Sequence, residues 1–132
     1  MNSSDWQHDL VDFHAAFGHP VAPAPTFDVV RVALRLSLMR EELNETAEAM
    51  LRKDIKDTAD GLADLMYVVL GTAVELGINM APVFAEVHRS NMSKLGANGQ
   101  PVTREDGKTL KGPNYSPPNL TDVLLRLGWD GR

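Results

Sequence analysis

Residues 39–50, "MREELNETAEAM", decide how this chain folds, because two helical periodicities overlap in them. At about 100° per residue, the apolar positions extend a stripe that begins upstream. That stripe comprises Val32, Leu36, Met39, Leu43, Ala47 and Met50. A second line on the same helix begins apolar and becomes acidic; it comprises Val30, Leu34, Leu38, Glu41, Glu45 and Glu48. A solvated face is usually polar along its whole length, so the second line predicts carboxylates that continue a buried surface.

The next helical segment repeats this arrangement. Its main core stripe is predicted to comprise Leu62, Leu65, Met66, Val69, Ala73 and Leu76. Asp57, Asp60 and Asp64 lie on the opposite side, on a line that runs on into Val68 and Gly71. The short turn "RKDIKD", residues 52–57, joins the two helices. An antiparallel hairpin of this kind would bring the two acidic patches together near the turn.

Start and stop signals place these helices in the chain. A first helix, capped by Ser3 or Ser4, carries Trp6, Leu10, Phe13 and Phe17 at helical spacing and ends at Gly18. The prolines of "HPVAPAPT", residues 19–26, require an extended connector. The second helix is expected to start at Thr26 or Asp28 and to run to about Arg52. The third is expected to run from Asp54 or Asp57 to Leu76, before Gly77.

The remainder of the chain is predicted to be one more helix, a loop and a short closing helix. Pro82 suits the first turn of a helix over residues 82–95, ended by Gly96. Residues 96–119 are rich in Gly, Pro and Asn, and "TREDGKTL" has the Asp-Gly signal of a tight hairpin turn. Residues 119–128 indicate the closing helix. We therefore expect one domain, residues 1–132, that folds as an all-α bundle of about four main helices with a long C-terminal loop.

Composition restricts the function classes. A net charge of -5 and a pI near 5.2 argue against a general nucleic-acid-binding protein. Cysteine is absent, which excludes disulfides and thiolate metal sites. No apolar run approaches the roughly 20 residues of a membrane span, and the N-terminal residues lack a signal-peptide pattern. We expect a cytoplasmic protein with no membrane partner.

The grouped carboxylates favour a metal site. Two unit charges at ~4 Å repel by about 1 kcal/mol in water and about 4 kcal/mol near a protein surface. Either acidic patch alone is most simply a solvated face, but two patches on adjacent helices favour a bound cation. All candidate ligands are oxygen donors, and the histidines are scattered at positions 8, 14, 19 and 88. A hard ion, Mg²⁺ or Mn²⁺, is therefore expected rather than Zn²⁺.

These residues carry a resemblance to a known superfamily. "EELNE", residues 41–45, followed by "DGLADLMYVVLGTAVELGI", residues 60–78, resembles the all-α nucleoside triphosphate pyrophosphohydrolases of the MazG type. That superfamily includes phosphoribosyl-ATP pyrophosphohydrolase and dimeric dUTPase-like enzymes. "VFAEVHRSNMSK" and "DGKTLKGPNYSPP" are similar to one small MazG-like branch, and the resemblance covers about residues 9–120.

The resemblance implies a set of metal ligands. Glu42 and Glu45 match the first Glu-x-x-Glu pair of the superfamily, Asp64 matches the final Asp of Glu-x-x-Asp, and Glu41 matches an additional acidic position. The chain departs from the pattern at Gly61, where the superfamily has Glu. Asp60, a helical turn before Asp64, is the expected replacement.

The implied reaction splits a nucleoside triphosphate between the α and β phosphates, giving a monophosphate and pyrophosphate. Glu41 or Glu42 is expected to orient or deprotonate the attacking water. The candidates for binding the nucleotide are Arg89, Asn91, Lys94, Lys108, Lys111 and Tyr115. For each lysine, an ordinary solvated side chain is an equally good interpretation, and we expect structural roles for His88 and Tyr67.

Two rival functions remain open at the level of sequence. One is phosphoribosyl-ATP hydrolysis, which is the same chemistry on a different substrate. The other is a non-catalytic helical interaction protein, which the departure at Gly61 favours. The helices are apolar on two sides, and related enzymes assemble through subunit contacts, so a homodimer or homotetramer is expected. In such an assembly "NMSK" or the loop "DGKTLKGPNY" would reach a neighbour's nucleotide.

Overall fold

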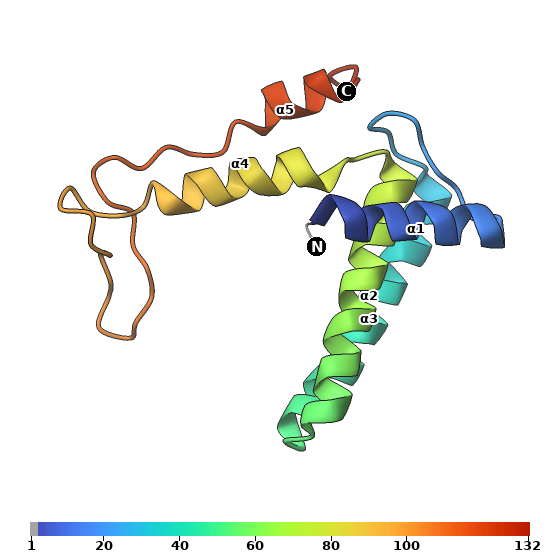
Figure 1. The fold of residues 1–132 in the computed structure, drawn as a ribbon, viewed down its shortest axis with the longest axis horizontal. Coiled ribbons are helices and arrows are strands. Elements are labelled where there is room, and N and C mark those ends of the chain that lie inside the picture. The colour runs from blue at the N-terminus through green and yellow to red at the C-terminus, as the bar shows by residue number, and fades with distance from the viewer. Residues whose placement is uncertain (1–2) are drawn as a thin grey trace.

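The computed structural model describes residues 3–132 and confirms the all-α class. Within these residues the elements are α1 (Ser3–Phe17), α2 (Val29–Leu51), α3 (Ile55–Leu76), α4 (Met80–Met92) and α5 (Leu120–Arg126). Figure 1 shows α2 and α3 side by side as a long hairpin, with α1 across its open end. From that end α4 leads away from the hairpin, and the chain returns along α4 to α5.

The capping residues explain the predicted boundaries of α2 and α3. Asp28 caps α2, where its side chain accepts hydrogen bonds from the backbone N–H groups of Val30 and Arg31. Asp54 caps α3 in the same way. Gly77 ends α3 in the left-handed conformation, with φ of 71°. Of the two candidates at each helix start, the structure therefore selects Asp28 and Asp54. The predicted N-terminal cap of α1 at Ser3 or Ser4 involves side chains that lie outside those the structure describes.

The later elements differ from the prediction only at their ends. Asn79 caps α4, so the helix begins before Pro82, and it ends at Met92 rather than near Gly96. The predicted turn in "TREDGKTL" is confirmed by a single antiparallel bridge between Thr103 and Thr109. Asn119 caps the closing helix α5.

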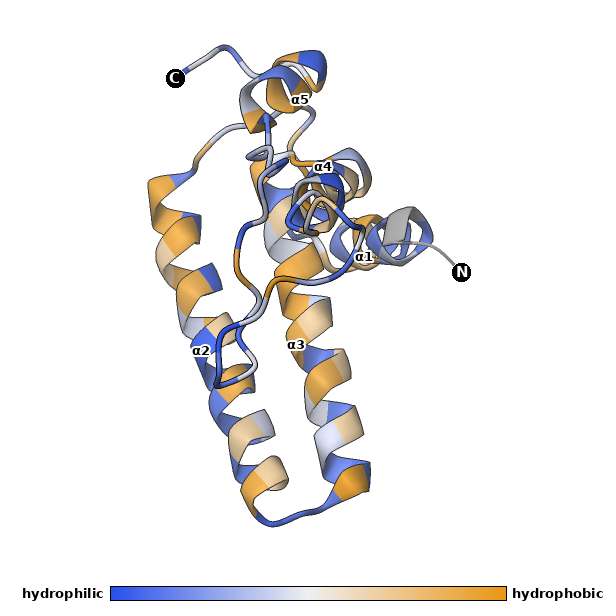
Figure 2. Ribbon diagram, turned by 90° about the vertical axis from the view of Figure 1, so that its left-hand side faces the viewer, coloured by the Kyte–Doolittle hydropathy of each residue, from blue (hydrophilic) through white to orange (hydrophobic). Residues whose placement is uncertain are grey.

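The prediction of the hydrophobic core on α2 and α3 is wrong at most positions, although the predicted core residue Ala73 is buried. The residues of α2 that are buried are Arg35, Thr46 and Ala49, which lie between the two predicted lines of that helix. The predicted core positions Leu36, Leu43, Leu62 and Met66 are each more than 40% exposed. The second line is not buried at its apolar end either, because Val30 is 81% exposed. The reason is that α2 and α3 meet along a narrow seam of small and polar residues, and both flanking stripes turn away from it. Figure 2 shows hydrophobic residues along both helices down to the turn.

Gly61 marks a close approach of α2 and α3 in this seam. A Cβ atom at Gly61 would lie 2.5 Å from Oγ1 of Thr46 and 3.1 Å from its Cα. The hydroxyl of Thr46 is held in place, because it donates to the carbonyl of Glu42 at 2.7 Å. The missing side chain therefore allows the two helix backbones to approach each other.

The open end of the hairpin is tied to α1 and to the connector. Gln7 of α1 donates through its amide to the carbonyl of Ile78 at 2.7 Å and accepts from the N–H of Met80 at 2.8 Å. The connector runs past the end of α3 so closely that a Cβ at Gly77 would lie 2.2 Å from the carbonyl oxygen of Ala24. These contacts hold α1, the connector and the start of α4 around the last turn of α3.

Taken singly, none of the described helices combines the length and hydrophobicity needed to cross a membrane. Only α3 and α4 taken together reach that threshold, and they are bent by 113° at their junction.

Replacing Gly61 by Ala should destabilise the protein by about 1–3 kcal/mol, because the added methyl group overpacks the seam. Denaturant unfolding at pH 7 measures this loss. The double variant Gly61→Ala/Thr46→Ala removes the nearest atom, so part of the loss should be recovered. Equal stability of Gly61→Ala and the wild type would show that α2 and α3 do not pack as described.

Candidate active site

The structure brings together the carboxylates that the sequence singles out on α2 and α3. Glu42 is half-buried beside the seam, and the other four are exposed around it: Glu41, Glu45, Asp60 and Asp64. Burial raises the pKa of the Glu42 carboxyl, and the charges of Glu45, Asp64, Glu41 and Asp60 raise it further. The two acidic patches of the hairpin therefore form one electrostatic cluster, as predicted.

One oxygen in this cluster lacks a partner. Oε2 of Glu42 is buried, and no hydrogen-bond donor within residues 3–132 reaches it. A buried carboxylate oxygen without a donor is costly, because it has lost its water without compensation. A proton or a cation at this position would remove the cost.

The cluster is not a preformed metal cage. In the part of the chain that the structure describes, no three carboxylate or histidine side chains converge closely enough to hold an ion. Four of the five carboxylates are exposed, so rotation of their side chains can bring oxygens toward Glu42. The donor set consists of carboxylate oxygens, which fits Mg²⁺ or Mn²⁺.

The structure gives a physical reason for the departure at Gly61. A glutamate at this position would drive its Cβ into Thr46, because the helix backbones are too close there. Asp60, one residue earlier, is exposed and contributes to the raised pKa of Glu42. On this turn of α3, Asp60 therefore offers the carboxylate beside Asp64 that Gly61 lacks.

Sequence reasoning missed a second charged cluster, at the open end of the hairpin. Glu75 of α3 is buried and accepts from Nε of Arg31 at 2.7 Å and from Nη1 of Arg35 at 3.0 Å. Arg35 also donates to the carbonyl of Val68 at 2.9 Å. His14 of α1 is buried 3.9 Å from Glu75, and its Nδ1–H donates to the carbonyl of Pro20 at 2.9 Å. The signal in the sequence was a pair of arginines one turn apart on an apolar helix.

The carboxyl group of Glu75 stays ionised despite its burial. Burial raises the pKa of Glu75, but the hydrogen bond from Arg31 and the charges of Arg35 and Arg31 outweigh it, so the pKa lies below its ordinary value. Burial also lowers the pKa of Arg35, and the neighbouring Glu75 opposes that shift. The two guanidinium groups and the carboxylate compensate one another across α2 and α3.

A cavity of about 240 Å³ lies beside this charged cluster, with Arg31 in its lining. The lining also includes the rings of Phe13, His19 and Tyr67. Phe13 meets Tyr67 edge-on, with 5.4 Å between ring centroids. The lining residues Leu38 and Val68 lie one helical turn from Glu42 and Asp64 respectively, so the cavity adjoins the carboxylates.

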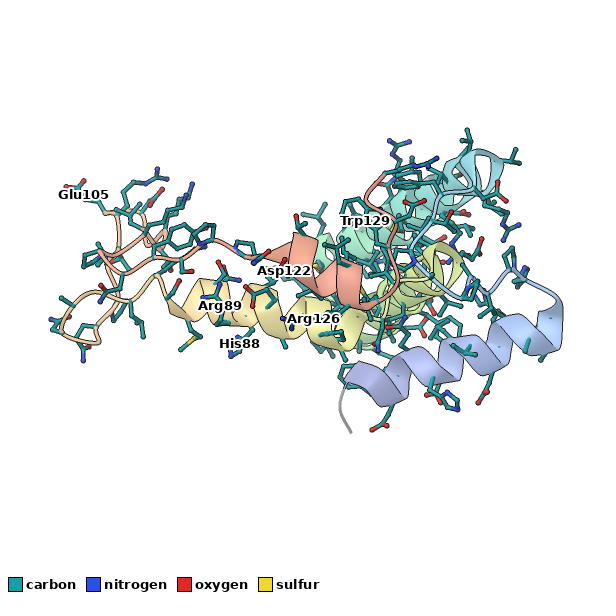
Figure 3. All side chains as sticks on the ribbon, turned by 90° about the horizontal axis from the view of Figure 1, so that it is seen from above. His88, Arg89, Glu105, Asp122, Arg126 and Trp129 are labelled. Carbon is teal, nitrogen blue, oxygen red and sulfur yellow. The ribbon has the colours of Figure 1, made fainter. Side chains whose placement is uncertain are left out.

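The residues expected to bind phosphate lie elsewhere in the same chain. Arg89 is paired with Glu86 at 2.8 Å and donates to the carbonyl of Pro117 at 3.1 Å. The pair with Arg89 lowers the pKa of Glu86 to about 2. Figure 3 shows Arg89 on α4 beside the returning C-terminal segment, and His88 on the same helix.

The lysines are also outside the acidic cluster of their own chain. Lys111 lies 4.7 Å above the ring of Tyr115, with both residues in the long loop. Lys94 and Lys108 belong to the loop that follows α4, residues 93–115. Figure 1 shows this loop at the far end of α4, away from the α2–α3 hairpin. Asn91 is exposed near the end of α4. One chain therefore does not bring these groups to the carboxylates.

Comparison with known proteins identifies the family of the chain. The sequence model of the phosphoribosyl-ATP pyrophosphohydrolase family matches residues 10–91, so the chain belongs to that family. Uncharacterized protein L479 of Acanthamoeba polyphaga mimivirus is 36% identical over 74 residues. That match covers 52% of this chain, and the chain spans only 30% of that relative's length.

A crystal structure from Exiguobacterium sp. 255-15 is also similar to this chain; its protein is provisionally assigned as an NTP pyrophosphohydrolase. The two chains are 28% identical, with 93% of each covered and a TM-score of 0.47.

Replacing Glu75 by Gln should lower the free energy of unfolding at pH 7 by about 3–5 kcal/mol, because Arg31 and Arg35 lose their carboxylate. The folded-state pKa of Glu75 is lowered, so its contribution is complete above the unfolded value, roughly 4.3, and is lost as the pH falls through the folded value. The difference between wild type and variant should therefore shrink below about pH 4. Denaturant unfolding at several pH values measures it.

Asp57→Asn is the matched control for this prediction. Asp57 pairs with Arg52 at 3.2 Å on the surface, so its loss should cost less than about 1 kcal/mol. Similar losses for the two variants, or a difference for Glu75→Gln that persists unchanged to pH 2, would contradict the assignment of Glu75.

Proposed function

We propose that this protein hydrolyses a (deoxy)nucleoside triphosphate between the α and β phosphates, in a Mg²⁺-dependent reaction that serves nucleotide-pool housecleaning. The observation that carries the proposal is the unpartnered, buried Oε2 of Glu42 inside a cluster of five carboxylates. Membership of the phosphoribosyl-ATP pyrophosphohydrolase family supports the class of reaction.

Glu42, Glu45 and Asp64 are the proposed direct ligands, with Glu41 and Asp60 as further ligands or partners of ligands. When bound, Mg²⁺ neutralises phosphate oxygens and lowers the pKa of a coordinated water. Occupation of the cluster would also offset the burial and the neighbouring negative charges that raise the pKa of Glu42.

The protein's own groups would then position the reactants. Whichever of Glu41 and Glu42 is not fully used in coordination would accept a hydrogen bond from the attacking water and take its proton. The nucleotide base would occupy the adjoining cavity, where the rings of Phe13, His19 and Tyr67 offer stacking surfaces. The triphosphate would then extend from the cavity along the seam to the carboxylates.

The remaining phosphate charge requires cations. Lys94, Lys108 and Lys111 belong to the loop that follows α4, which lies at the far end of that helix, and Arg89 of α4 is paired with Glu86. We propose that these groups act on the site of a neighbouring copy in a homodimer or homotetramer, where the loop over residues 96–119 reaches the nucleotide. Asn91 and Tyr115 would accompany them.

Phosphoribosyl-ATP is the second candidate substrate, because the matching family carries its name. The chemistry at the α phosphorus would be the same, and only the group attached to the nucleotide would differ. A nucleotide panel that includes phosphoribosyl-ATP separates the two candidates.

Incubation with Mg²⁺ in ¹⁸O-labelled water tests the reaction. Attack at the α phosphorus should place the label in the monophosphate and leave the released pyrophosphate unlabelled. Mass spectrometry of the products, with pyrophosphate and orthophosphate assayed separately, measures this. Orthophosphate as the first product from a triphosphate would contradict the proposal.

The variant Glu45→Gln tests whether the hydrolysis depends on the carboxylate cluster of α2 and α3. It preserves the shape of the side chain but removes a proposed ligand, so turnover should fall by about 100-fold or more while the circular dichroism spectrum is retained. Glu48→Gln is the matched control, because Glu48 is on the same helix line and is not a proposed ligand. Equal activity of the two variants would show that Glu45 is not a ligand in the site.

A further inference from the structure

We infer that the cavity beside Arg31 selects nucleotides whose base carries a carbonyl oxygen, rather than an amine, on the ring edge remote from the sugar. Guanine, hypoxanthine, uracil and thymine are oxo bases of this kind, whereas adenine and cytosine carry an amine there. The inference rests on the proposed function, which places the base in this cavity. It adds the group that selects the base, the guanidinium of Arg31, and it ranks phosphoribosyl-ATP, an adenine nucleotide, below the oxo-base triphosphates.

The polar groups that line this cavity are mostly basic. They are the side chains of Arg31, Arg35, His14 and His19, together with the phenol of Tyr67. Among the described residues in the lining, none carries a carboxylate. Glu75, which pairs with both arginines, instead lines the groove of about 170 Å³ that also includes Phe27 and Leu36. Of the buried ionic cluster, the cavity therefore meets the arginines and not their carboxylate.

Arg31 has hydrogen-bond donors to spare. Its Nε and Nη2 donate to the two oxygens of Glu75 at 2.7 and 2.9 Å, and its other N–H groups make no hydrogen bond within residues 3–132. Arg35, in contrast, uses all three of its nitrogens, on Thr72, Glu75 and the carbonyl of Val68. A guanidinium donates and never accepts, so a ligand edge that meets Arg31 must supply an acceptor.

The rest of the lining fits a flat ring better than a phosphate group. It consists of the aliphatic side chains of Leu10, Leu34, Leu38 and Val68 and the aromatic ring of Phe13, which meets the ring of Tyr67. A base can stack on such surfaces, whereas a phosphate would lose its water to them without compensation. The acceptor that a base can offer to Arg31 without carrying a charge is a carbonyl oxygen.

The direction of the nucleotide decides which edge of the base meets Arg31. In the proposed function the triphosphate extends toward Glu42 and Asp64. Arg31 is the first residue of α2 in the lining and Leu38 is the last, so Arg31 lies at the end remote from those carboxylates. The base edge remote from the sugar therefore faces Arg31. An amine on that edge would set donor against donor and leave both without an acceptor.

Titration of the ¹⁵N-labelled full chain with nucleosides tests the inference without phosphate, metal or turnover. Inosine and adenosine form a matched purine pair, and uridine and cytidine form a matched pyrimidine pair; the members of each pair differ at this edge. The amide signals of residues 31–38 and 67–68 should shift. Within each pair that binds, the oxo nucleoside should bind about tenfold or more tightly than the amino nucleoside.

Two variants assign this preference to Arg31. Arg31→Lys keeps a positive charge beside Glu75 but loses the fork of donors, so the preference should fall to about twofold or less. Arg40→Lys is the matched control, because Arg40 is exposed on the same helix and is not in the lining, so the preference should be retained.

Equal binding within the pairs, or no binding of any of the four nucleosides, would overturn the inference. Inorganic phosphate that shifts the same signals would also overturn it, since the lining would then bind an anion. If Arg31→Lys does not fold, the wild-type pairs decide alone. Failure of the proposed function gives a different result, in which the nucleosides show the preference while no triphosphate is hydrolysed. Hydrolysis of ATP and inosine triphosphate with equal kcat/KM would overturn the inference and leave the proposed function intact.

Discussion

The close approach of α2 and α3 is the constraint on which the rest of this structure depends. Thr46 and Gly61 meet with no room for a further atom, so the two backbones run close together. Residues one helical turn from this contact are held near each other across the hairpin, whatever their charge. Glu42 and Asp64 both lie one turn from it, toward the open end of the hairpin, and burial together with the charges of Glu45 and Asp64 raises the pKa of Glu42. The seam thus concentrates negative charge that two separate helices would keep apart.

The hairpin compensates its buried charge differently at its two ends. At the open end Glu75 is neutralised within the chain by Arg31 and Arg35, and this ionic cluster holds α2, α3 and, through His14, α1. Nearer the turn, Arg40 is exposed and Glu42 keeps a buried oxygen without a donor. The first arrangement is complete and serves stability. The second is incomplete, which is the expected state of a site that awaits a cation and an anionic substrate.

Helix boundaries could be predicted from the sequence because caps and stops act locally. Asp28, Asp54 and Gly77 are where the local rules place them, and the acidic cluster followed from helical periodicity. The choice of core face could not be predicted, because the stripe with the most leucine and methionine is uncovered in this chain. Burial of Arg35 and Glu75 depends on their meeting across two helices, and the close packing of Gly61 depends on Thr46. Such pairings are tertiary, so periodicity alone does not reveal them.

The central claim is that the seam gathers Glu42, Glu45 and Asp64 into a divalent-cation site. Titration of ¹⁵N-labelled protein with Mn²⁺ tests it most directly, since the ion broadens the NMR signals of nearby amides and needs no substrate. At substoichiometric Mn²⁺ the account predicts that the amide signals of residues 41–46 and 60–65 disappear first, and that excess Mg²⁺ restores them. Signals from Asp9 and Asp12 on α1, which are acidic but outside the seam, should persist. Loss of the α1 signals first, or equal broadening of every acidic segment, would contradict the account.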